Sequence, residues 1–517
     1  MTQVVENHVA ALANSSSIEI ALVSGGRNDG LTETTRRTVS ELVVSALDYD
    51  DVLDEKEQSS PRAPTLAREI ARVLSDRDLG PDDTILHWHN PTLGKNTSIP
   101  AVIKYLSREF GFRQLLQIHD YSEDYRPDNY VRLAQASIRE SKLTEITPQT
   151  VTDYCYPNSD GIHYATLTNA DADVLRGIGI PIDRIEVVPN SVSLSGSDQN
   201  VELDAAASKA KICHAFDLGR DRTWGLYPVR GIRRKNVGEF VFLAQLLPES
   251  HTLGITLPPT TPIEAESYER WRQVAKECSP KAIFDAGTVD GIGFTDNLAA
   301  SSFVVSTSAA EGFGMAFLEP WLVGRGVIAR KLSNIVDDFE AAGVDLRRFY
   351  SSLPVVGRPA WIRERKREYA VALQQAWSSI VDSFGHAFRI DDGIVESDCD
   401  QIDFAQLLPQ VQMQVIKRVA SDAGYLRALR DSAHAVLSSF QAPFESSVLQ
   451  SNKNRIRDVY CLSSTAEILQ QRYAALSSVS VDDARQLSGI QSDVSPLSLL
   501  HQSRDFFPCR TERTISK

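Results

Sequence analysis

The stretch Ser308-Ala-Ala-Glu-Gly-Phe-Gly-Met-Ala-Phe-Leu-Glu319 is the most informative part of the sequence. The apolar run 303–307 before it predicts a buried strand, and an apolar helix start follows its glycines. Such a corner leaves the backbone N–H groups of residues 313–316 free, where the helix dipole favours a bound phosphate. Glu319, further along the helix, has the chemistry to accept hydrogen bonds from two vicinal hydroxyls, as on a ribose. The alternative is a plain corner in which Glu311 caps the helix.

Strands and helices alternate on both sides of this stretch, in two series. The first series has expected strands at 18–24, 84–89, 113–119, 162–168 and 184–188, and expected helices at 32–47, 65–74, 99–110 and 170–175. The second has expected strands at 223–229, 252–257, 282–286, 303–307 and 327–330, and expected helices at 237–247 and 264–278. This alternation predicts two doubly wound α/β domains, with ligands at the carboxyl ends of parallel strands.

The domain boundaries follow from these series. We expect a flexible tail over residues 1–17, one Rossmann-like domain over 18–205 and a second over 206–360. Residues 361–517 are mostly helical in pattern, and we expect them to complete the second domain in part.

Composition restricts the classes of function. The 517 residues include 54 Lys and Arg against 68 Asp and Glu, a formal net charge of −14, so we expect no nucleic-acid partner. No apolar run reaches the ~18 residues that cross a bilayer. The N-terminus lacks a basic region before an apolar stretch, and the six cysteines form no C-x-x-C pair. These features predict a cytoplasmic protein without a membrane span or a disulfide framework.

A second chemically rich segment is Tyr227-Pro-Val-Arg-Gly-Ile-Arg-Arg-Lys-Asn236, which follows the first strand of the second series. Arg230 and Lys235 lie at a strand end, where two cations neutralise a diphosphate without a metal. The alternative is a basic surface loop.

Two segments of the first series have weaker signals. His119 ends the strand over 113–119, either as a group that faces a ligand or as a structural histidine. Gly25 and Gly26 end the first strand and permit close approach of a ligand to the backbone, although an ordinary turn explains them too.

Together these segments resemble the retaining glycosyltransferases of the GT-B fold, specifically the large family 4. Arg230 and Lys235 match its Arg with a Lys five residues on, and Glu311 and Glu319 match its E-x7-E motif. Further matches are Gly287, Gly324, Val327-Ile328, His119-Asp120 and the segment 188–192. Departures from the family pattern are Val229, Ser191, Pro320 and Gly326. The resemblance covers residues 18–335 and implies two Rossmann-like domains that face a cleft, with an additional helical C-terminal region.

The resemblance also implies an activity: transfer of a hexose, glucose or mannose, from a UDP- or GDP-sugar to a hydroxyl acceptor, with retention and without a metal or other cofactor. It makes the first domain the acceptor domain and the second the nucleotide-sugar domain. The implied catalytic residues are His119, Arg230, Lys235 and Glu311. The implied donor-binding residues are Gly25, Gly26, Arg230, Lys235, Gly287, Glu311, Gly312, Phe313, Gly314, Met315 and Glu319.

The acceptor is expected at two loops of the first domain that are rich in polar groups. Lys95 and Arg126 are candidates to bind a carboxylate or phosphate, and Tyr121 and Tyr125 to stack on a sugar. The expected acceptor-binding residues are Lys95, Asn96, Asp120, Tyr121 and Arg126. Ordinary surface loops are the alternative.

Other functions remain open at this stage. His87 and His89 share a strand face and with His119 form a conceivable metal site, but no acidic residue has matching spacing, so we expect no metal. A GT-B relative with other chemistry, such as a nucleotide-sugar epimerase or a phosphorylase, is one alternative to a transferase. A non-catalytic scaffold of the same fold is another.

Overall fold

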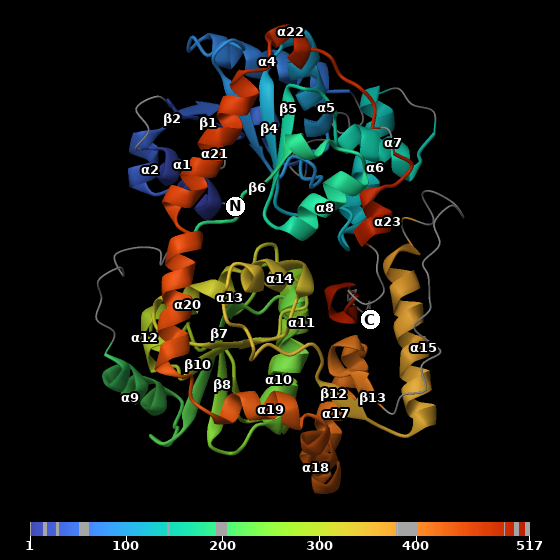
Figure 1. The fold of residues 1–517 in the computed structure, drawn as a ribbon. Coiled ribbons are helices and arrows are strands. Elements are labelled where there is room, and N and C mark those ends of the chain that lie inside the picture. The colour runs from blue at the N-terminus through green and yellow to red at the C-terminus, as the bar shows by residue number, and fades with distance from the viewer. Residues whose placement is uncertain are drawn as a thin grey trace. The chain divides into compact units, whose positions relative to one another are not determined.

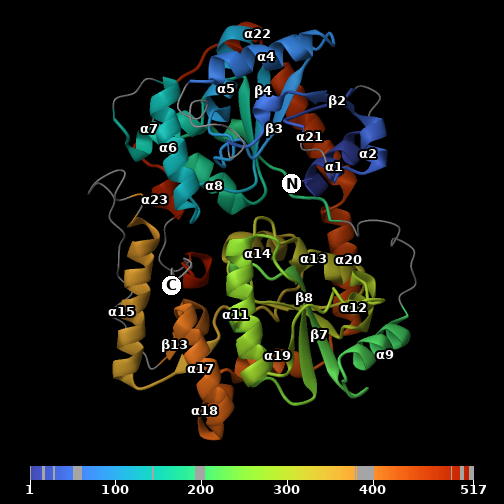
Figure 2. The ribbon, with the colours of Figure 1, turned by 180° about the vertical axis from the view of Figure 1, so that it is seen from behind.

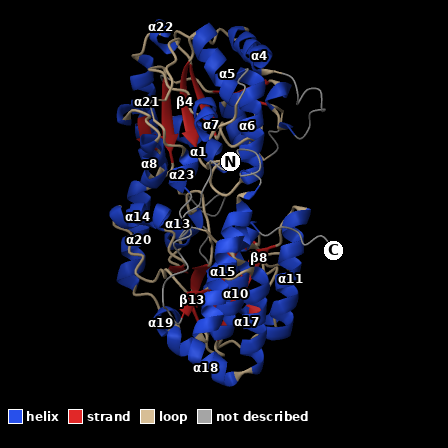
Figure 3. Ribbon diagram, turned by 90° about the vertical axis from the view of Figure 1, so that its right-hand side faces the viewer, coloured by secondary structure: helices blue, strands red, loops and turns tan. Residues whose placement is uncertain are grey.

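The structure, a computed structural model, describes residues 2–13, 18–26, 30–50, 61–141, 145–192, 204–378, 380, 401–490, 492–500 and 506–511. The chain forms two compact units (Figure 1). The first is Met1–Ser191, Trp377–Arg389 and Tyr460–Gln502, and the second is Val192–Ala376, Ile390–Val459 and Ser503–Lys517. In each unit the strands lie inside and helices cover them (Figure 3).

The first unit contains two parallel sheets, a four-stranded one in the order β3-β4-β5-β6 and a separate pair β1-β2. The strands are β1 (Ala21–Ser24), β2 (Ser40–Val43), β3 (Ile85–His89), β4 (Arg113–Ile118), β5 (Ile162–Thr166) and β6 (Ile185–Val187). Every residue of β4 and β5 is buried, as expected for central strands covered on both faces.

The helices of the first unit come from both ends of the chain. They are α1 (Thr2–Leu12), α2 (Glu33–Thr38), α4 (Ala63–Ser75), α5 (Ile99–Tyr105), η3 (Leu106–Phe110), α6 (Pro127–Ser141), α7 (Pro148–Cys155), α8 (Asn169–Gly177), α21 (Leu462–Ser477), α22 (Val481–Ala484) and α23 (Pro496–Leu500). The last three are C-terminal, and α21 lies beside α1 and against β3 and β4 (Figures 1 and 2). Leu469 and Leu476 of α21 share a core cluster with Leu12 of α1 and Leu115 of β4.

The second unit has one five-stranded parallel sheet in the order β11-β10-β7-β8-β9. Its strands are β7 (Thr223–Arg230), β8 (His251–Leu257), β9 (Ala282–Ile283), β10 (Phe303–Ser306) and β11 (Val327–Ala329), with a small antiparallel pair, β12 (Pro354–Val356) and β13 (Gln401–Asp403). The prediction of two Rossmann-like α/β domains with parallel sheets and a helical C-terminal region is confirmed.

The helices of the second unit are α9 (Ala205–Ala215), η6 (Arg233–Lys235), α10 (Val237–Leu246), α11 (Pro262–Cys278), α12 (Phe294–Ala300), α13 (Met315–Leu322), α14 (Ser333–Ala341), α15 (Pro359–Ala376), α17 (Pro409–Ser421), α18 (Ala423–Ser432), α19 (His434–Gln441), α20 (Ser446–Val459) and η10 (Pro508–Thr511). Helix α10 is buried at every position because its apolar residues surround the axis. It packs on β8, α11 and α17.

Two expectations about the N-terminal part were wrong. Residues 1–17 were expected as a flexible tail, but Thr2–Leu12 form α1, whose Val9 and Leu12 are buried. The helix expected over 32–47 is the short α2 followed by strand β2. Leu42 and Val44 are buried while Val43 between them is exposed, and this alternation suits a strand that pairs with β1.

Helices α6 and α7 were not predicted, and the region after residue 361 contributes to both units. The segment that follows the candidate glycines Gly25 and Gly26 falls in part outside the described residues, because residues 27–29 are not described. Among the helices that the structure describes, none has the length and apolar character to cross a membrane.

Candidate functional site

The sheet of the second unit has a topological switch point between β7 and β10. From β7 the chain builds outward through β8 and β9, whereas β10 and β11 lie on the opposite side. The connections therefore leave a crevice at the carboxyl ends of β7 and β10, where open parallel sheets bind ligands. The segments that follow these two strands carry Lys235 and Glu311.

Backbone and hydroxyl groups hold these two segments together. The amide of Ala309 donates to the carbonyl of Arg234 at 2.8 Å. The carbonyl of Lys235 accepts from the hydroxyls of Tyr227 (3.0 Å) and Thr307 (3.1 Å). Asn236 begins α10 with a φ of 50°, a conformation that asparagine tolerates. The geometry after β7 is thus fixed by groups from β7 and from the β10 turn.

Lys235 and Glu311 form a buried ion pair at this point. The hydroxyl of Ser308 also donates to Glu311 Oε1 at 2.6 Å, and Arg234 lies 4.0 Å from Glu311 Oε2. Burial raises the pKa of Glu311, but the charges of Lys235 and Arg234 outweigh it and hold the pKa below its usual value. Glu311 is therefore a carboxylate at neutral pH.

Arg230 does not join this pair. Its side chain is exposed, and its guanidinium donates to the carbonyl of Pro258 at 2.8 Å. The second cation near Glu311 is Arg234, which the sequence analysis did not select although it stands beside Lys235.

Helix α13 begins at Gly314 without a side-chain cap. The φ of Gly314 is 86°, in the left-handed region, and a Cβ there would lie 2.8 Å from Phe317. Phe313 is buried against Phe339, while Gly312 and Met315 are half-buried. Because no side chain caps α13, the interpretation of Glu311 as its cap is wrong, and the first N–H groups of the helix are not used by such a cap.

Glu319 lies one turn into α13 and is half-buried. Burial raises its pKa, and none of the described residues forms a hydrogen bond or ion pair with its carboxylate. An unpaired, partly buried carboxylate costs stability, which a ligand that donates hydrogen bonds would offset.

Gly287 lies in the turn after β9, where its amide donates to the carbonyl of Thr256 at 2.9 Å. A Cβ there would lie 3.1 Å from that carbonyl oxygen, so the close approach to β8 favours glycine.

The first unit contains a cavity of about 730 Å³ between the β1 strand and β3. At the carboxyl ends of these strands it is lined by Gly25, Tyr49, His89, Asn90, Lys95 and Asn96. A Cβ on Gly25 would lie 2.5 Å from the amide nitrogen of Asp48, so this glycine is required by the neighbouring loop. Gly26, with a φ of 101°, is exposed. Lys95 is exposed, with its ammonium 5.7 Å from the centre of the Tyr49 ring.

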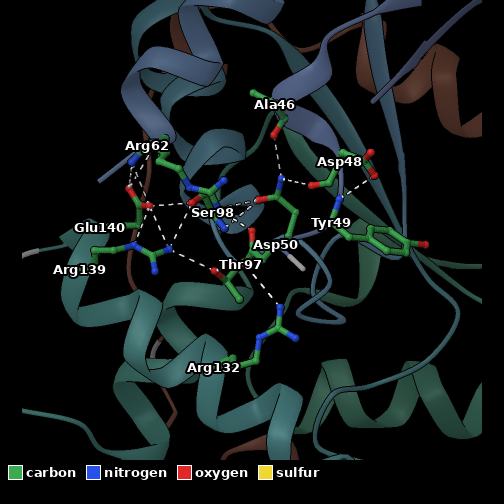
Figure 4. Close-up of polar contacts among 12 residues, drawn as sticks. Ala46, Asp48, Tyr49, Asp50, Arg62, Thr97, Ser98, Arg132, Arg139 and Glu140 are labelled. Atoms are coloured by element: carbon green, nitrogen blue, oxygen red, sulfur yellow. Dashed lines mark hydrogen bonds and ion pairs between the residues drawn. The ribbon is translucent and has the colours of Figure 1, made fainter. Parts of the chain in front are cut away.

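The loop that carries Lys95 is held by a network that the sequence analysis missed (Figure 4). Asp50 accepts hydrogen bonds from the amide (2.9 Å) and hydroxyl (2.6 Å) of Thr97 and pairs with Arg62 at 2.6 Å. Burial raises the pKa of Asp50, but these donors outweigh it and lower the pKa overall. Asn96 donates to the carbonyls of Ala46 (2.9 Å) and Asp48 (2.8 Å) and so holds the loop over residues 46–48.

His119 lies beyond β4 and is buried. Its Nε2 is 3.0 Å from Nδ1 of His89, and its backbone amide donates to the side chain of Asn90 at 3.3 Å. Burial, with the His87 charge second, lowers its pKa to about 3. The ring of His119 is thus neutral and is linked to the cavity through His89.

The remaining expected acceptor residues form a separate group. Arg126 pairs with Asp120 at 2.7 Å and donates to the carbonyl of Tyr121 at 2.8 Å. Tyr121 is buried and donates to the carbonyl of Asp171, and Tyr125 is buried against Trp377. The expectation that these two rings stack on a sugar was therefore wrong, because neither ring has an accessible face.

This chain is similar to a curated relative and to several solved structures. No family model matches the chain. A mannosylglucosyl-3-phosphoglycerate synthase of Petrotoga mobilis is 27% identical over 292 residues, which is 56% of this chain and 54% of the relative. The match thus spans about half the length of this curated relative.

Solved structures are similar at low identity. A sucrose-phosphate synthase from Thermosynechococcus elongatus has a TM-score of 0.48 at 14% identity and covers 92% of this chain and 93% of its own. A glycosyltransferase from Rickettsia africae has a TM-score of 0.47 at 12% identity, with coverages of 92% and 96%. Anabaena Alr3699/HepE in complex with UDP has a TM-score of 0.47 at 11% identity, with coverages of 93% and 97%.

Proposed function

We propose that this protein is a glycosyltransferase that moves a hexose, glucose or mannose, from a UDP- or GDP-sugar to a hydroxyl of a small anionic acceptor. The buried Lys235–Glu311 pair at the switch point of the second unit carries the proposal. It places a cation and a carboxylate next to a helix N-terminus, which is the set of groups that a sugar diphosphate requires. The relative's name, which denotes the synthesis of a phosphoglycerate that carries two sugars, supports the same class of reaction.

The donor half of the proposed reaction belongs to the second unit. Lys235, with Arg234, Arg230 and the first N–H groups of α13, stabilises the negative charge that develops on the departing diphosphate. Glu311, held ionised by Lys235, accepts hydrogen bonds from the hydroxyls of the transferred sugar. Glu319 accepts them from the ribose. Gly287, Gly312, Phe313, Gly314 and Met315 shape the backbone around the nucleotide.

The acceptor half belongs to the first unit. The cavity at β1 and β3 has room for a small sugar derivative, and Lys95 supplies a cation at its lining. His119 contacts His89, and through it takes part in binding sugar hydroxyls near the same strand ends. Asp120, Tyr121 and Arg126 support this edge, and Asn96 fixes the Lys95 loop. We further propose that the configuration at the sugar is retained, that the leaving phosphate takes the proton of the acceptor hydroxyl, and that the transfer needs no metal.

The donor is tested first, by thermal unfolding with UDP, GDP, ADP and their glucose and mannose forms, each with and without EDTA. A nucleotide at 100 times its dissociation constant stabilises by roughly 2.7 kcal/mol. We expect a shift with one base, lost in Lys235→Ala and kept in Lys276→Ala, which changes an exposed lysine of α11. Equal shifts in both variants, or no shift with any nucleotide, contradict the proposal.

The acceptor is tested with the donor so identified. Lys95→Ala should raise the KM for an anionic acceptor such as a sugar phosphoglycerate, while Arg68→Ala, at an exposed position of α4, should not. NMR of the product reports whether the configuration is retained. Isomerisation or hydrolysis of the donor without an acceptor would favour an epimerase. Consumption of phosphate without a nucleotide would favour a phosphorylase. Full function in variants that lack Lys235 and Glu311 would favour a scaffold.

A further inference from the structure

Four histidine rings lie in contact inside the first unit, and two of them, His89 and His119, belong to the proposed acceptor site. His8 comes from α1, His87 and His89 from β3, and His119 from the end of β4. The ring centres of His8 lie 5.6 Å from His87 and 5.3 Å from His89. Those of His87 and His89 are 4.5 Å apart, and His119 lies 5.3 Å from His89.

His8 has no polar partner in this cluster. Its side chain is 4% exposed, and neither ring nitrogen has a hydrogen-bond partner among the described residues. A buried imidazole with both nitrogens unsatisfied is destabilising, because both atoms have lost their hydrogen bonds to water. The ring is directed at two other imidazoles, so a group that accepts lone pairs from all three would remove this cost.

Imidazole is a common metal ligand in proteins, and the rings of His8, His87 and His89 come together from α1 and β3.

The hydrogen bonds of the strand histidines leave Nε2 of His89 for a metal, whereas both nitrogens of His87 have hydrogen-bond partners. His89 bonds to His119 through Nδ1, which leaves Nε2. His87 bonds through Nε2 to Gln117 at 2.9 Å, and its Nδ1 is 2.8 Å from the hydroxyl of Tyr473. Gln117 and His119 thus act as outer partners that fix the two rings. Tyr473 competes for the remaining nitrogen of His87.

We propose that His8, His87 and His89 bind one divalent transition-metal ion, with Zn²⁺ as the preferred ion. One nitrogen of each residue lies within 4.8 Å of the other two. Tetrahedral zinc with Zn–N bonds near 2.0–2.1 Å requires nitrogens about 3.4 Å apart, so the rings need to close by an ångström or so. An all-imidazole set suits zinc, copper or nickel and not magnesium or calcium.

The ion would attach the N-terminal helix to the sheet. His8 is the ligand contributed by α1, and the other two lie on one face of β3 because they alternate along the strand. His87 and His89 also line the cavity of this unit, which provides room for a fourth ligand such as water. The site shares His89 with the proposed acceptor cavity but is independent of the donor half of the proposed function, since it uses none of the donor groups.

Metal content tests the site, measured on the full chain expressed without a histidine tag. After incubation with Zn²⁺ and dialysis, mass spectrometry should find about one zinc per chain. His8→Phe and His89→Phe, which keep an aromatic ring without a ligand, should lose it. His214→Phe and His434→Phe, which change exposed histidines of the second unit, should keep it. Far-UV circular dichroism identifies any variant that fails to fold.

Three further variants separate a metal site from a packing role. His8→Cys restores a zinc ligand and should retain the ion. Gln117→Met should weaken zinc binding about 10–100-fold, as loss of outer partners does. Tyr473→Phe should strengthen it, because Nδ1 of His87 loses its competitor. Absence of zinc from the folded wild-type chain, or equal zinc in His8→Phe, His89→Phe and wild type, would overturn the proposal whatever the outcome of the nucleotide screen.

Discussion

Lys235 and Glu311 are a buried charge pair, and such pairs contribute little net stability because both groups lose their hydration. Their placement is better explained by the ligand that we propose for this edge of the sheet. The pair holds Glu311 ionised and presents Lys235 in a fixed geometry, since its backbone is bonded to Tyr227 and Thr307.

Glu319 gives a prediction about pH. Its pKa is raised by burial, so it becomes protonated at a higher pH than an exposed glutamate and then loses one acceptor site. The affinity for the nucleoside diphosphate should fall between about pH 7.5 and about pH 5 more steeply in wild type than in Glu319→Gln. Isothermal titration calorimetry measures the affinity of both proteins at each pH. Titration of the ligand's phosphate affects both proteins equally and so does not contribute to the difference between them.

Glu319→Gln also serves as a control, because the direction of its effect on stability without ligand follows from the raised pKa of Glu319. A carboxyl whose folded pKa is raised destabilises the folded state as pH rises through that pKa. Glu319→Gln without ligand should therefore be more stable than wild type at pH 7.5, and the difference should shrink at lower pH. If the nucleotide affinities of the two proteins depend on pH in the same way, Glu319 does not bind the ribose. If their stabilities without ligand depend on pH in the same way, Glu319 is not buried as described.

Among the elements, the start of α13 depends on Gly314. Gly314→Ala places a Cβ against Phe317, whereas Gly324→Ala meets no atom within 4 Å, and both have a positive φ. We expect ~1 kcal/mol of lost stability for Gly324→Ala and roughly 1–3 kcal/mol more for Gly314→Ala. Urea denaturation measures both. Gly314→Ala should also weaken nucleotide binding, and equal losses in the two variants would contradict this account of α13.

Helix α10 is joined to β11 and β13 by a buried charge network. Arg330 of this network donates to both carboxylate oxygens of Glu239 (3.0 and 2.6 Å) and pairs with Asp403 at 2.7 Å. Burial is the largest influence on Glu239 and raises its pKa, while Arg330 opposes this.

Removal of the central cation should destabilise the second unit strongly. Arg330→Met leaves two carboxylates without their partner, and we expect a loss of about 3–5 kcal/mol in the free energy of unfolding. Arg347→Met, which breaks the pair of the exposed Arg347 with Asp345, should cost far less, because solvent screens this pair. Urea denaturation compares the two, and similar losses would mean that the buried network is not required.

At the scale of the whole molecule, the C-terminal part of the chain completes the first unit. Leu469 of α21 is fully buried in a cluster with residues from α1, β4 and β5. All three of these elements lie more than 300 positions earlier in the sequence. The two units are thus not separable by a single cut in the chain.

Paired core substitutions test this division. Leu469→Ala and Leu243→Ala each create a cavity that costs about 2–5 kcal/mol. Native-state hydrogen exchange should show lost protection in β4 for Leu469→Ala and in β8 for Leu243→Ala, because each leucine lies in the core of one unit. Loss of protection in β8 upon Leu469→Ala would place α21 with the second unit instead.

Local patterns were sufficient for the architecture. Short strand-like segments such as 113–119 and 303–307 predicted strands, and their alternation with helices predicted parallel sheets. Lys235 and Glu311 could be selected because each follows a strand at the carboxyl edge of a parallel sheet, which is where such sheets bind ligands. The element at 32–47 could not be predicted, because apolar spacing over so short a segment fits both a helix and a strand, and pairing with β1 decides between them.

The sequence by itself determined which charged and polar side chains follow the ends of strands, because hydrophobic periodicity and turn residues are local properties. Tertiary structure alone decided which of these groups meet. It brought Arg234 rather than Arg230 beside Glu311, buried Tyr121 and Tyr125, and placed His8 of α1 against His87 and His89. Contacts between residues that lie tens or hundreds of positions apart depend on packing and on the satisfaction of buried polar groups, which no local pattern encodes.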